Sequence, residues 1–312
     1  MEPAIVLRDL HRSYGHGEKA FEAVGGIDLD VPTGTICALL GTNGAGKTST
    51  LEVIEGLAPP TSGTVRVLGL DPVGSRDAVR RRTGVLLQRS GFSGDLTVAE
   101  TLRMWSVTVT GARPVQQALA MLGLEDRADT RVRSLSGGEQ RRLDLACTLL
   151  GEPDVVLLDE PTTGLDPESR RQVWQLIRGL RDRGATVLLT THYLEEAEAL
   201  ADRLDIMHRG RIVRSGTPQE LAGGHPSTVS FVTPAQPVPD RLAAGRRDGG
   251  SGVTVLETSD LQQTLTELLD WANRHEVRLE HLQARAASLE SVFLRIADDS
   301  DPQQSTLAGA QR

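Results

Sequence analysis

The sequence predicts an α/β fold built on a parallel sheet, because strand, loop and helix signals follow one another in a characteristic order. Residues 36–40 and 155–158 are short, wholly apolar runs, as is typical of parallel strands buried on both faces. The first run leads directly into residues 41–48, which fit the phosphate-binding pattern GxxxxGK[ST]. Leu51 and Ile54 then recur at helical spacing. A strand, a glycine-rich loop and a helix in this order form a P-loop unit.

The residue types of this loop suit a phosphate group, although a glycine-rich turn capping an ordinary helix is the alternative. Glycines adopt positive φ angles and let backbone N–H groups close around an anion at the positive end of a helix. Lys47 adds a compact charge in a chain whose only other lysine is Lys19, and Thr48 adds a hydroxyl for Mg²⁺. The residues expected to bind the nucleotide are Gly41, Asn43, Gly44, Ala45, Gly46, Lys47, Thr48 and Ser49.

Length and composition describe a globular chain with room for one large domain and a small one: 312 residues, 38% hydrophobic and 24% charged. The N-terminus lacks a signal-peptide pattern and no apolar run could cross a bilayer, so we expect a soluble chain whose membrane role requires a partner. The net charge of -8 argues against nucleic-acid binding, and arginine clusters 80–82 and 141–142 are expected on solvated helix faces. Cys37 and Cys147 lie in apolar stretches and are expected to be reduced core thiols.

The first part of the chain reads as short strands, expected at 5–7, 27–31, 63–68 and 83–87. Tyr14 lies between the first two and could stack on a purine base, with a half-buried loop tyrosine as the alternative. The fourth strand ends in Gln88, which opens a mainly helical stretch to about residue 124.

A small polar turn at 135–139, Leu-Ser-Gly-Gly-Glu, precedes a helical run at 140–150. Free N–H groups and a helix dipole would make this turn a second anion site, worth about 0.3–1 kcal/mol from the dipole alone. The alternative is that Ser136 simply caps the helix.

Two carboxylates, Asp159 and Glu160, follow the apolar strand at 155–158. Adjacent carboxylates at a strand tip are costly unless a cation lies nearby. In a P-loop ATPase the first would hold Mg²⁺ and the second would orient water. Asp166 follows in a turn, and a strand at 185–190 ends at His192, on the edge where parallel α/β sheets bind ligands.

Taken in chain order, these elements resemble the ATPases of ABC transporters. The order of the A-loop, Walker A, Q-loop, signature, Walker B, D-loop and switch histidine is matched by Tyr14, residues 41–48, Gln88, Ser136-Gly137-Gly138, Asp159-Glu160, Asp166 and His192. The resemblance covers about residues 5–221, and the signature turn just before a Walker B strand is its most specific element. Glu139 departs from the family pattern, in which many relatives have glutamine, while the Ser-Gly-Gly turn is intact.

The resemblance implies an ATPase that uses Mg²⁺ in a head-to-tail dimer with two equivalent sites. The implied catalytic residues are Glu160, which positions water, His192, which senses the γ-phosphate, and Gln88; the implied metal ligands are Thr48, Gln88 and Asp159. The remaining implied nucleotide contacts are Tyr14, stacked on adenine, and Ser136, Gly137, Gly138 and Asp166, with Ser136 closing over ATP held by Lys47 of the other copy.

Residues 164–167 and 191–196 resemble the ATPases of ABC-2 type exporters, including the daunorubicin-resistance group. This implies an ATP-hydrolysing subunit at the cytoplasmic face of the cell membrane that energises a separate integral-membrane permease, for drug or antibiotic efflux. The alternative, a soluble ABC ATPase acting on ribosomes or DNA, usually carries tandem cassettes or a coiled coil, and the sequence shows neither. A regulator without turnover would lack the catalytic carboxylate, and Glu160 is present.

The expected fold is a P-loop NTPase of the ABC ATPase type, with a helical signature subdomain at about 92–150 and a small C-terminal α+β accessory domain. The expected ranges are 1–222 and 226–298, followed by a polar, disordered tail at 299–312. In the second domain, strands are expected at 229–232, 253–256 and 277–279, with a helix that starts at a capping-box pattern of Ser259 and Gln262. A final helix carries Leu289, Val292, Phe293 and Ile296.

Overall fold

The chain folds into two compact units, Met1–Thr217 and Pro218–Arg312. The computed structural model describes residues 2–293 except 16, 18–19, 89–90, 224–225, 240–241, 243–245, 249–251, 287 and 291, and only the backbone of 246–248. The division falls shortly before residue 222, where the sequence places the end of the first domain. The tail expected to be disordered, 299–312, lies outside the described residues.

A six-stranded sheet forms the centre of the first unit, in the order β5-β6-β7-β3-β8-β9. Its strands are β3 (Ile36–Leu40), β5 (Thr83–Leu86), β6 (Val155–Asp159), β7 (Thr186–Thr191), β8 (Arg203–His208) and β9 (Arg211–Gly216). All neighbours pair in parallel except β8 and β9, which are antiparallel. Because β7 lies between β3 and β6, the carboxyl ends of these three strands meet at one edge. The predicted α/β fold with a parallel sheet is confirmed.

Strands β8 and β9 have no counterpart in the sequence prediction. Four residues of β8 are buried, but charged residues interrupt its apolar run, and β9 is an edge strand that is mostly exposed. An edge strand needs no alternating apolar pattern, and charged side chains protect its free side. Neither strand therefore carries the signal by which the other strands were found.

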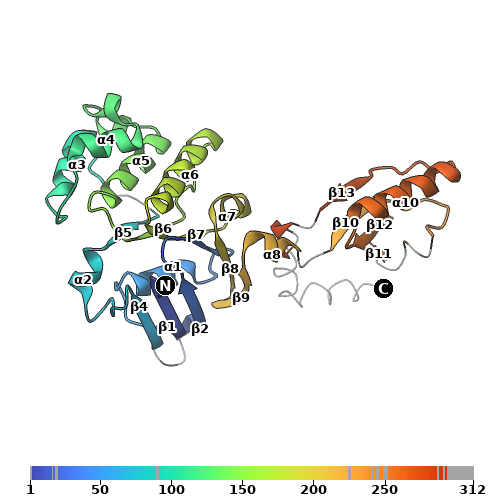
Figure 1. Ribbon diagram of the computed structural model, residues 1–312, viewed down its shortest axis with the longest axis horizontal. Coiled ribbons are helices and arrows are strands. Elements are labelled where there is room, and N and C mark those ends of the chain that lie inside the picture. Colours follow the sequence, from blue (N-terminus) through green and yellow to red (C-terminus); the bar gives the residue numbers. More distant parts are fainter. Residues whose placement is uncertain are drawn as a thin grey trace. The chain divides into compact units, whose positions relative to one another are not determined.

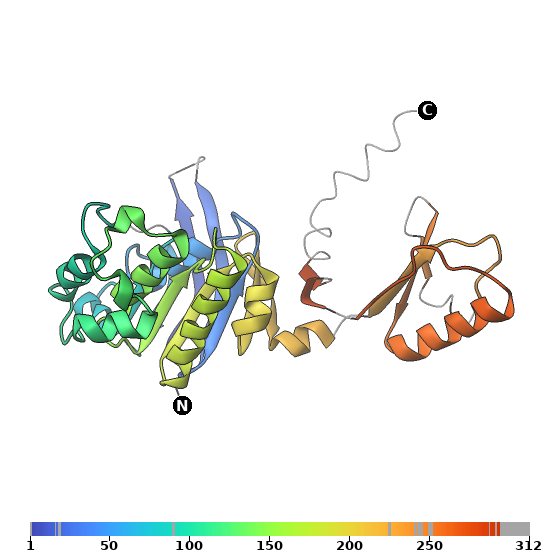
Figure 2. The same ribbon diagram turned by 90° about the horizontal axis from the view of Figure 1, so that it is seen from above.

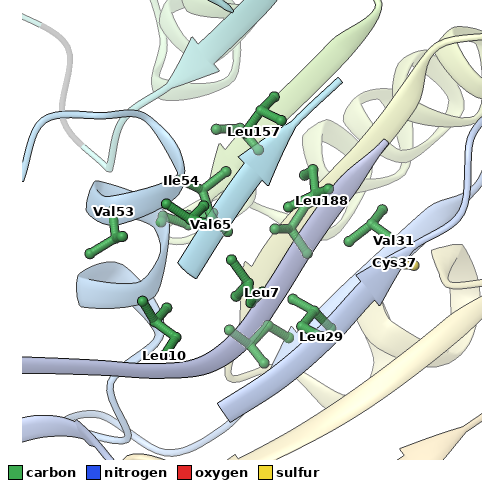
Figure 3. Close-up of a cluster of buried hydrophobic side chains, with 14 of the residues drawn as sticks. Leu7, Leu10, Leu29, Val31, Cys37, Val53, Ile54, Val65, Leu157 and Leu188 are labelled. Carbon is green, nitrogen blue, oxygen red and sulfur yellow. The ribbon is translucent and has the colours of Figure 1, made fainter. Parts of the chain in front are cut away.

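A three-stranded antiparallel sheet, in the order β2-β1-β4, covers helix α1. The elements are β1 (Ile5–Tyr14), β2 (Phe21–Val31), β4 (Ser62–Val67) and α1 (Lys47–Ile54). Leu7, Leu29 and Val65 from this sheet share a buried cluster with Ile54 of α1 and Leu188 of the central sheet (Figure 3). β1 is longer than expected, so Tyr14 is the last residue of a strand rather than part of a loop.

Helices α3, α4 and α5 gather into one lobe of the first unit (Figure 1). The helices of this unit are α2 (Arg76–Arg80), α3 (Val98–Ser106), α4 (Val115–Leu122), α5 (Gly137–Thr148), α6 (Pro167–Asp182) and α7 (Leu194–Leu200), with short 3-10 turns η2 (Glu125–Arg127) and η3 (Val132–Ser134). The lobe lies within the range expected for the helical subdomain. α5 begins at Gly137, three residues earlier than expected, because Ser136 is its N-cap.

The second unit holds a four-stranded antiparallel sheet with helix α10 packed on it (Figure 2). Its elements are α8 (Pro218–Gly223), β10 (Ser227–Val232), β11 (Arg246–Asp248), β12 (Val253–Thr258), α10 (Leu261–Arg274) and β13 (Gln283–Arg285). Phe231, Leu256, Leu268 and Trp271 lie in its core.

Two details of this unit correct the sequence prediction. Residues 277–279 are not a strand; the strand of this region is β13, a few residues later. The N-cap of α10 is Asp260 rather than Ser259, and its side chain accepts a hydrogen bond from Gln263 N. Leu289 and Val292 of the predicted final helix are buried, whereas Ile296 lies outside the described residues.

Both cysteines are buried and free, which confirms the prediction of core thiols. Burial raises the pKa of the Cys37 thiol to about 12 and also raises that of Cys147. Throughout the described residues, every helix is too short or too polar to span a membrane.

Candidate functional site

Two glycines of the loop between β3 and α1 are required by close backbone contacts. Gly46 is the N-cap of α1 with a φ of 103°, and a Cβ atom there would lie 2.4 Å from Ala23 O. A Cβ atom at Gly41 would lie 2.5 Å from Met207 O. No side chain caps α1, so its first N–H groups and its dipole remain available to an anion.

Lys47 is buried at the centre of this loop, with only 5% of its surface exposed. Its Nζ donates to Gly41 O at 2.8 Å and to Thr42 O at 3.1 Å, and lies 3.7 Å from Glu160 Oε1. Burial lowers the pKa of Lys47 below its ordinary value, against the opposing charges of Glu160 and Asp159. The loop thus holds the ammonium group of Lys47 close to the carboxylate of Glu160, which follows β6.

Asp159 ends β6 and accepts hydrogen bonds from two hydroxyl groups. Thr48 Oγ1 donates to Asp159 Oδ2 at 3.1 Å, and Thr190 Oγ1 donates to Asp159 Oδ1. A hydroxyl and a carboxylate side by side are oxygen ligands of the kind that Mg²⁺ takes together with substrate phosphates. Within the described part of the chain no cluster of three or more His, Cys, Asp and Glu side chains could hold a metal alone. The donor set therefore fits Mg²⁺ bound with a nucleotide.

The carboxylate of Glu160 contacts residues of two other motifs, Gln88 and His192. Its oxygens accept hydrogen bonds from Gln88 Nε2 at 3.4 Å and Thr163 Oγ1 at 3.1 Å, and Oε1 lies 3.1 Å from His192 Nδ1. Burial alone would raise its pKa, but the bonds from His192 and Thr163 and the charge of Lys47 outweigh burial and hold the pKa below its ordinary value. The group is therefore an ionised hydrogen-bond acceptor at neutral pH.

The backbone of Glu160 is strained. Its φ of 46° lies in the left-handed region, which costs a non-glycine residue on the order of 1–3 kcal/mol. Its N–H is held by Thr190, whose backbone oxygen lies at 3.2 Å and whose hydroxyl lies at 3.1 Å. The surrounding structure must hold this conformation for the carboxylate to point as it does.

A cleft of about 330 Å³ brings most of the predicted residues together. It is lined by Tyr14, Phe21, Ala23, Asn43, Gly44, Ala45, Gly46, Lys47, Thr48, Ser49, Gln88 and Glu160. The hydroxyl of Tyr14 donates to Glu52 Oε2 at 2.7 Å and lies 3.1 Å from the hydroxyl of Ser49. Arg12 lies 4.6 Å from the centre of the Tyr14 ring. Phe21 pairs with Tyr14 across two strands and is 65% exposed, so the mouth of the cleft carries two aromatic rings. Phe21 is not among the predicted site residues, since a single phenylalanine carries no sequence motif.

Ser136 of the signature and Asp166 of the D-loop are helix N-caps, and Gly137 and Gly138 lie in the first turn of α5. None of these four residues belongs to the described lining of the cleft. Ser136 accepts from Glu139 N while Glu139 Oε2 accepts from Ser136 N at 2.8 Å, a complete capping box on α5. Gly138 is needed, because a Cβ atom there would lie 2.3 Å from Ser169 Oγ. Asp166 caps α6 through the N–H groups of residues 168 and 169. The cap expected as the alternative for Ser136 is thus observed.

Arg141 overturns one expectation about the arginine clusters. Arg80, Arg81 and Arg82 are exposed as predicted, but Arg141 is 7% exposed and donates to backbone carbonyls at the ends of β5 and β6. Arg142 is half-buried against the carbonyls of residues 122 and 123. A charged pair in a helix gives no sequence signal of burial, because its partners are carbonyls supplied by distant segments.

Glu196 of α7 is a second buried group that sequence reasoning missed. It is fully buried, and its Oε1 accepts from Thr162 Oγ1 at 2.7 Å and Trp174 Nε1 at 3.1 Å. Burial raises its pKa above the ordinary value, against these hydrogen bonds. Glu196 of α7 therefore holds Thr162, in the segment that follows Asp159 and Glu160, and joins it to Trp174 of α6.

Comparison with known proteins matches both units. A family model described as ABC transporter matches residues 24–163, and one described as ABC transporter domain-containing protein-like, C-terminal domain, matches residues 227–288. The daunorubicin/doxorubicin resistance ATP-binding protein DrrA of Streptomyces peucetius is 38% identical over 305 residues, covering 93% of this chain and 92% of that protein. The Nod factor export ATP-binding protein I of Paraburkholderia xenovorans is 38% identical over 312 residues, covering 95% and 97%.

Solved structures of ATP-binding cassettes have the same fold. The ATP-binding subunit of an ABC transporter is 28% identical with a TM-score of 0.62, covering 70% of this chain and 91% of that one. A dimeric post-hydrolysis state of the cassette MJ0796, bound to ADP and Pi, is 26% identical with a TM-score of 0.60, covering 68% and 98%. These similarities concern the unit that carries the cleft.

Proposed function

The chain belongs to the family of ABC transporter ATP-binding proteins, and from this premise we propose that it works as a homodimer with Mg²⁺ to power a separate membrane permease. It is the ATP-binding, ATP-hydrolysing subunit of an exporter, as its relatives named for daunorubicin resistance and Nod factor export are. Its place is the cytoplasmic face of the membrane, and its transport role is the efflux of a drug or antibiotic. The alternative of a soluble ATPase for ribosomes or DNA is not favoured by these relatives.

One observation carries the catalytic part of the proposal: a single ionised carboxylate, Glu160, is within hydrogen-bond or ion-pair distance of Gln88, His192 and Lys47. Phosphoryl transfer leaves the protein little covalent work, so catalysis depends on positioning and charge stabilisation. Glu160 would hold the attacking water in line with the γ-phosphorus while the bond to the ADP oxygen breaks. Lys47 and the N–H groups of the loop would stabilise the phosphate oxygens, and His192 would contact the γ-phosphate.

Thr48 and Asp159 are the residues that would hold Mg²⁺, with Gln88 as a further ligand at the mouth of the cleft. The bound ion would neutralise charge on the β- and γ-phosphate oxygens. Tyr14 would stack on adenine with the ring face that Arg12 does not cover. Thr190, which donates to Asp159, keeps the carboxylate turned toward Thr48.

The separation of the predicted residues into two groups supports the proposed dimer. Residues 43–49 line the cleft, whereas Gly41 and also Ser136, Gly137, Gly138 and Asp166 do not belong to its described lining. A second copy in head-to-tail orientation would bring the start of α5 to the phosphates. Each of the two composite sites would then contain an intact loop and an intact signature.

The permease would dock on an apolar groove of about 280 Å³ beside β5. Leu87 and Trp105, 54% and 40% exposed, border it, and Phe92 contacts Trp105 edge to face with ring centres 6.0 Å apart. Gln88, which contacts Glu160, directly follows Leu87. An apolar helix of the permease in this groove would therefore contact Leu87, the neighbour in sequence of Gln88, which lines the catalytic cleft.

The test is ATP hydrolysis by the purified chain and by Glu160→Gln. The amide keeps the size of the side chain but loses its charge, so we expect turnover to fall by about 10²–10⁴-fold. ATP and Mg²⁺ should then trap the variant as a dimer in size-exclusion chromatography. Hydrolysis at the wild-type rate would remove Glu160 from the mechanism. A variant that binds ATP and remains monomeric would rule out the homodimer.

A further inference from the structure

The turn that carries the two carboxylates is held by one guanidinium group. Arg141 lies in α5, whose N-terminus is the signature turn, and it is 7% exposed. Its Nε donates to Pro161 O at 2.7 Å, and its Nη2 donates to Asp159 O and Glu160 O, both at 3.1 Å. Three consecutive carbonyls are thus gathered around one side chain.

The same guanidinium reaches the approach to the Q-loop. Arg141 Nη1 donates to Leu87 O at 2.8 Å, and Leu87 directly precedes Gln88. Asp144, one helical turn along α5, lies 3.7 Å from the same nitrogen. The guanidinium spreads five N–H donors over three nitrogens and reaches four carbonyls from two segments at once. An ammonium presents only three donors from a single nitrogen and cannot replace all of these bonds.

These contacts surround the one residue of the site whose backbone is strained. Glu160 has a φ of 46°, and such a conformation persists only where neighbouring groups over-determine it. Its N–H is held by Thr190, and its C=O accepts from Arg141. The hydroxyl of Thr162, two residues on, is fixed by Glu196. Arg141 supplies the contacts on the carbonyl side.

We propose that Arg141 is a positioning residue for hydrolysis: it holds the left-handed turn at Glu160 and links that turn to Gln88 and to the helix that begins at Ser136. The inference rests on the proposed role of Glu160. Because one side chain contacts α5, the end of β5 and the end of β6, a shift of α5 at the dimer interface would move the carbonyls that aim the carboxylate. Engagement of the signature and alignment of water would then be one event.

A structural role alone makes a different prediction. If Arg141 only joined the helical lobe to the sheet, its loss would lower stability and ATP binding together. A positioning role predicts a loss of turnover at nearly unchanged ATP affinity. The effect should also disappear once Glu160 can no longer act.

The experiment compares Arg141→Lys with Arg142→Lys, a matched control whose guanidinium contacts only carbonyls of residues 122 and 123 among the hydrogen bonds described. We expect Arg141→Lys to lower kcat by about 10–10²-fold with KM within about threefold, since a small misplacement of a catalytic group has effects of this size. The control should keep kcat within about twofold of the wild type. Thermal unfolding and ATP titration of both variants accompany the kinetics.

A double-mutant cycle with Glu160→Gln completes the test. If Arg141 acts through Glu160, adding Arg141→Lys to Glu160→Gln should change the residual rate by less than about twofold. Wild-type kcat in Arg141→Lys, an equal loss of ATP affinity, or a full additive effect in the double variant would each overturn the inference. If Glu160→Gln alone hydrolyses ATP normally, the proposed function fails instead, so the two failures are distinguishable.

Discussion

The helices α1 and α5 both begin at turns that the sequence marks as anion sites, but their N-termini are prepared differently. α1 starts at the buried Lys47, and its N-cap, Gly46, provides no side-chain cap. α5 starts with a closed capping box in which Glu139 accepts from Ser136 N, and Arg127 pairs with that carboxylate at 2.7 Å. The N-terminus of α1 is open to a phosphate of the nucleotide that its own chain binds. The N-terminus of α5 already holds a carboxylate, so it should engage phosphate only when a second copy presents one.

The largest expected effect falls on the open terminus. Lys47→Ala should weaken ATP binding by about 10–10²-fold, because a buried charge-assisted contact contributes about 1.5–3 kcal/mol. Isothermal titration with ATP and Mg²⁺ measures this, with circular dichroism to show that the fold is kept. Ser136→Arg is the control and should bind ATP as a monomer with wild-type affinity. If Lys47→Ala and the wild type bound ATP with equal affinity, the proposed difference between the N-termini of α1 and α5 would be wrong.

Mixing the two inactive variants should restore activity. In a dimer of Lys47→Ala with Ser136→Arg, one composite site pairs an intact Lys47 with an intact Ser136. Half of the randomly formed dimers are mixed and each has one working site, so an equimolar mixture should recover about a quarter of the wild-type rate. A steady-state ATPase assay across mixing ratios gives the curve. No recovery in demonstrated mixed dimers would show that the signature helix acts within its own chain.

The other end of α1 should give the chain a pH-dependent stability. Burial, with the charges of Asp159 and Glu52, raises the pKa of Glu55 to about 7 from an ordinary 4.5. The folded state therefore keeps a proton that the unfolded state loses, and this stability is present below pH 4.5 and lost as pH rises through about 7. Glu55→Gln should raise Tm by roughly 3–6 °C at about pH 8 and by little at about pH 4. A constant difference at all pH values would show that Glu55 does not titrate as described.

The smallest effect concerns the capping box of α5. Glu139→Gln keeps the box but removes a negative charge where phosphate should bind, so ATP-driven dimerisation should strengthen by about 2–5-fold at little change in stability. Glu139→Ala opens the box and should lower the stability of the unit by about 1 kcal/mol. Analytical ultracentrifugation and urea unfolding separate the two effects. Weaker dimerisation in Glu139→Gln would mean that the carboxylate supports the interface.

Local signals were enough for the parts of the site that lie within short motifs. The loop at 41–48, Gln88, Asp159, Glu160 and His192 each follow a strand whose apolar run is visible in the sequence, and the parallel sheet brings their strand ends to one edge. Motif and topology together therefore predicted which of these side chains would meet.

Groups whose partners come from distant segments gave no such signal. Arg141 and Glu196 look like surface charges in helices, yet both are buried. Arg141 donates to backbone carbonyls of other segments, and Glu196 Oε1 accepts from the Thr162 hydroxyl and the Trp174 indole. In the second unit the strand expected at 277–279 is irregular, and the cap of α10 is shifted by one residue. Short alternating runs there are compatible with several registers, and only tertiary packing selects one.

The position of β3 between β7 and β8 also determines the order in which the first unit can fold during synthesis. Both hydrogen-bonding edges of the strand that leads into the phosphate loop pair with segments made much later, residues 186–191 and 203–208. Until the ribosome has released those segments, β3 remains an apolar strand with two unpaired edges. Nucleotide therefore cannot yet stabilise the folded unit by binding to it. The nascent first unit should depend on chaperones until its last central strands emerge.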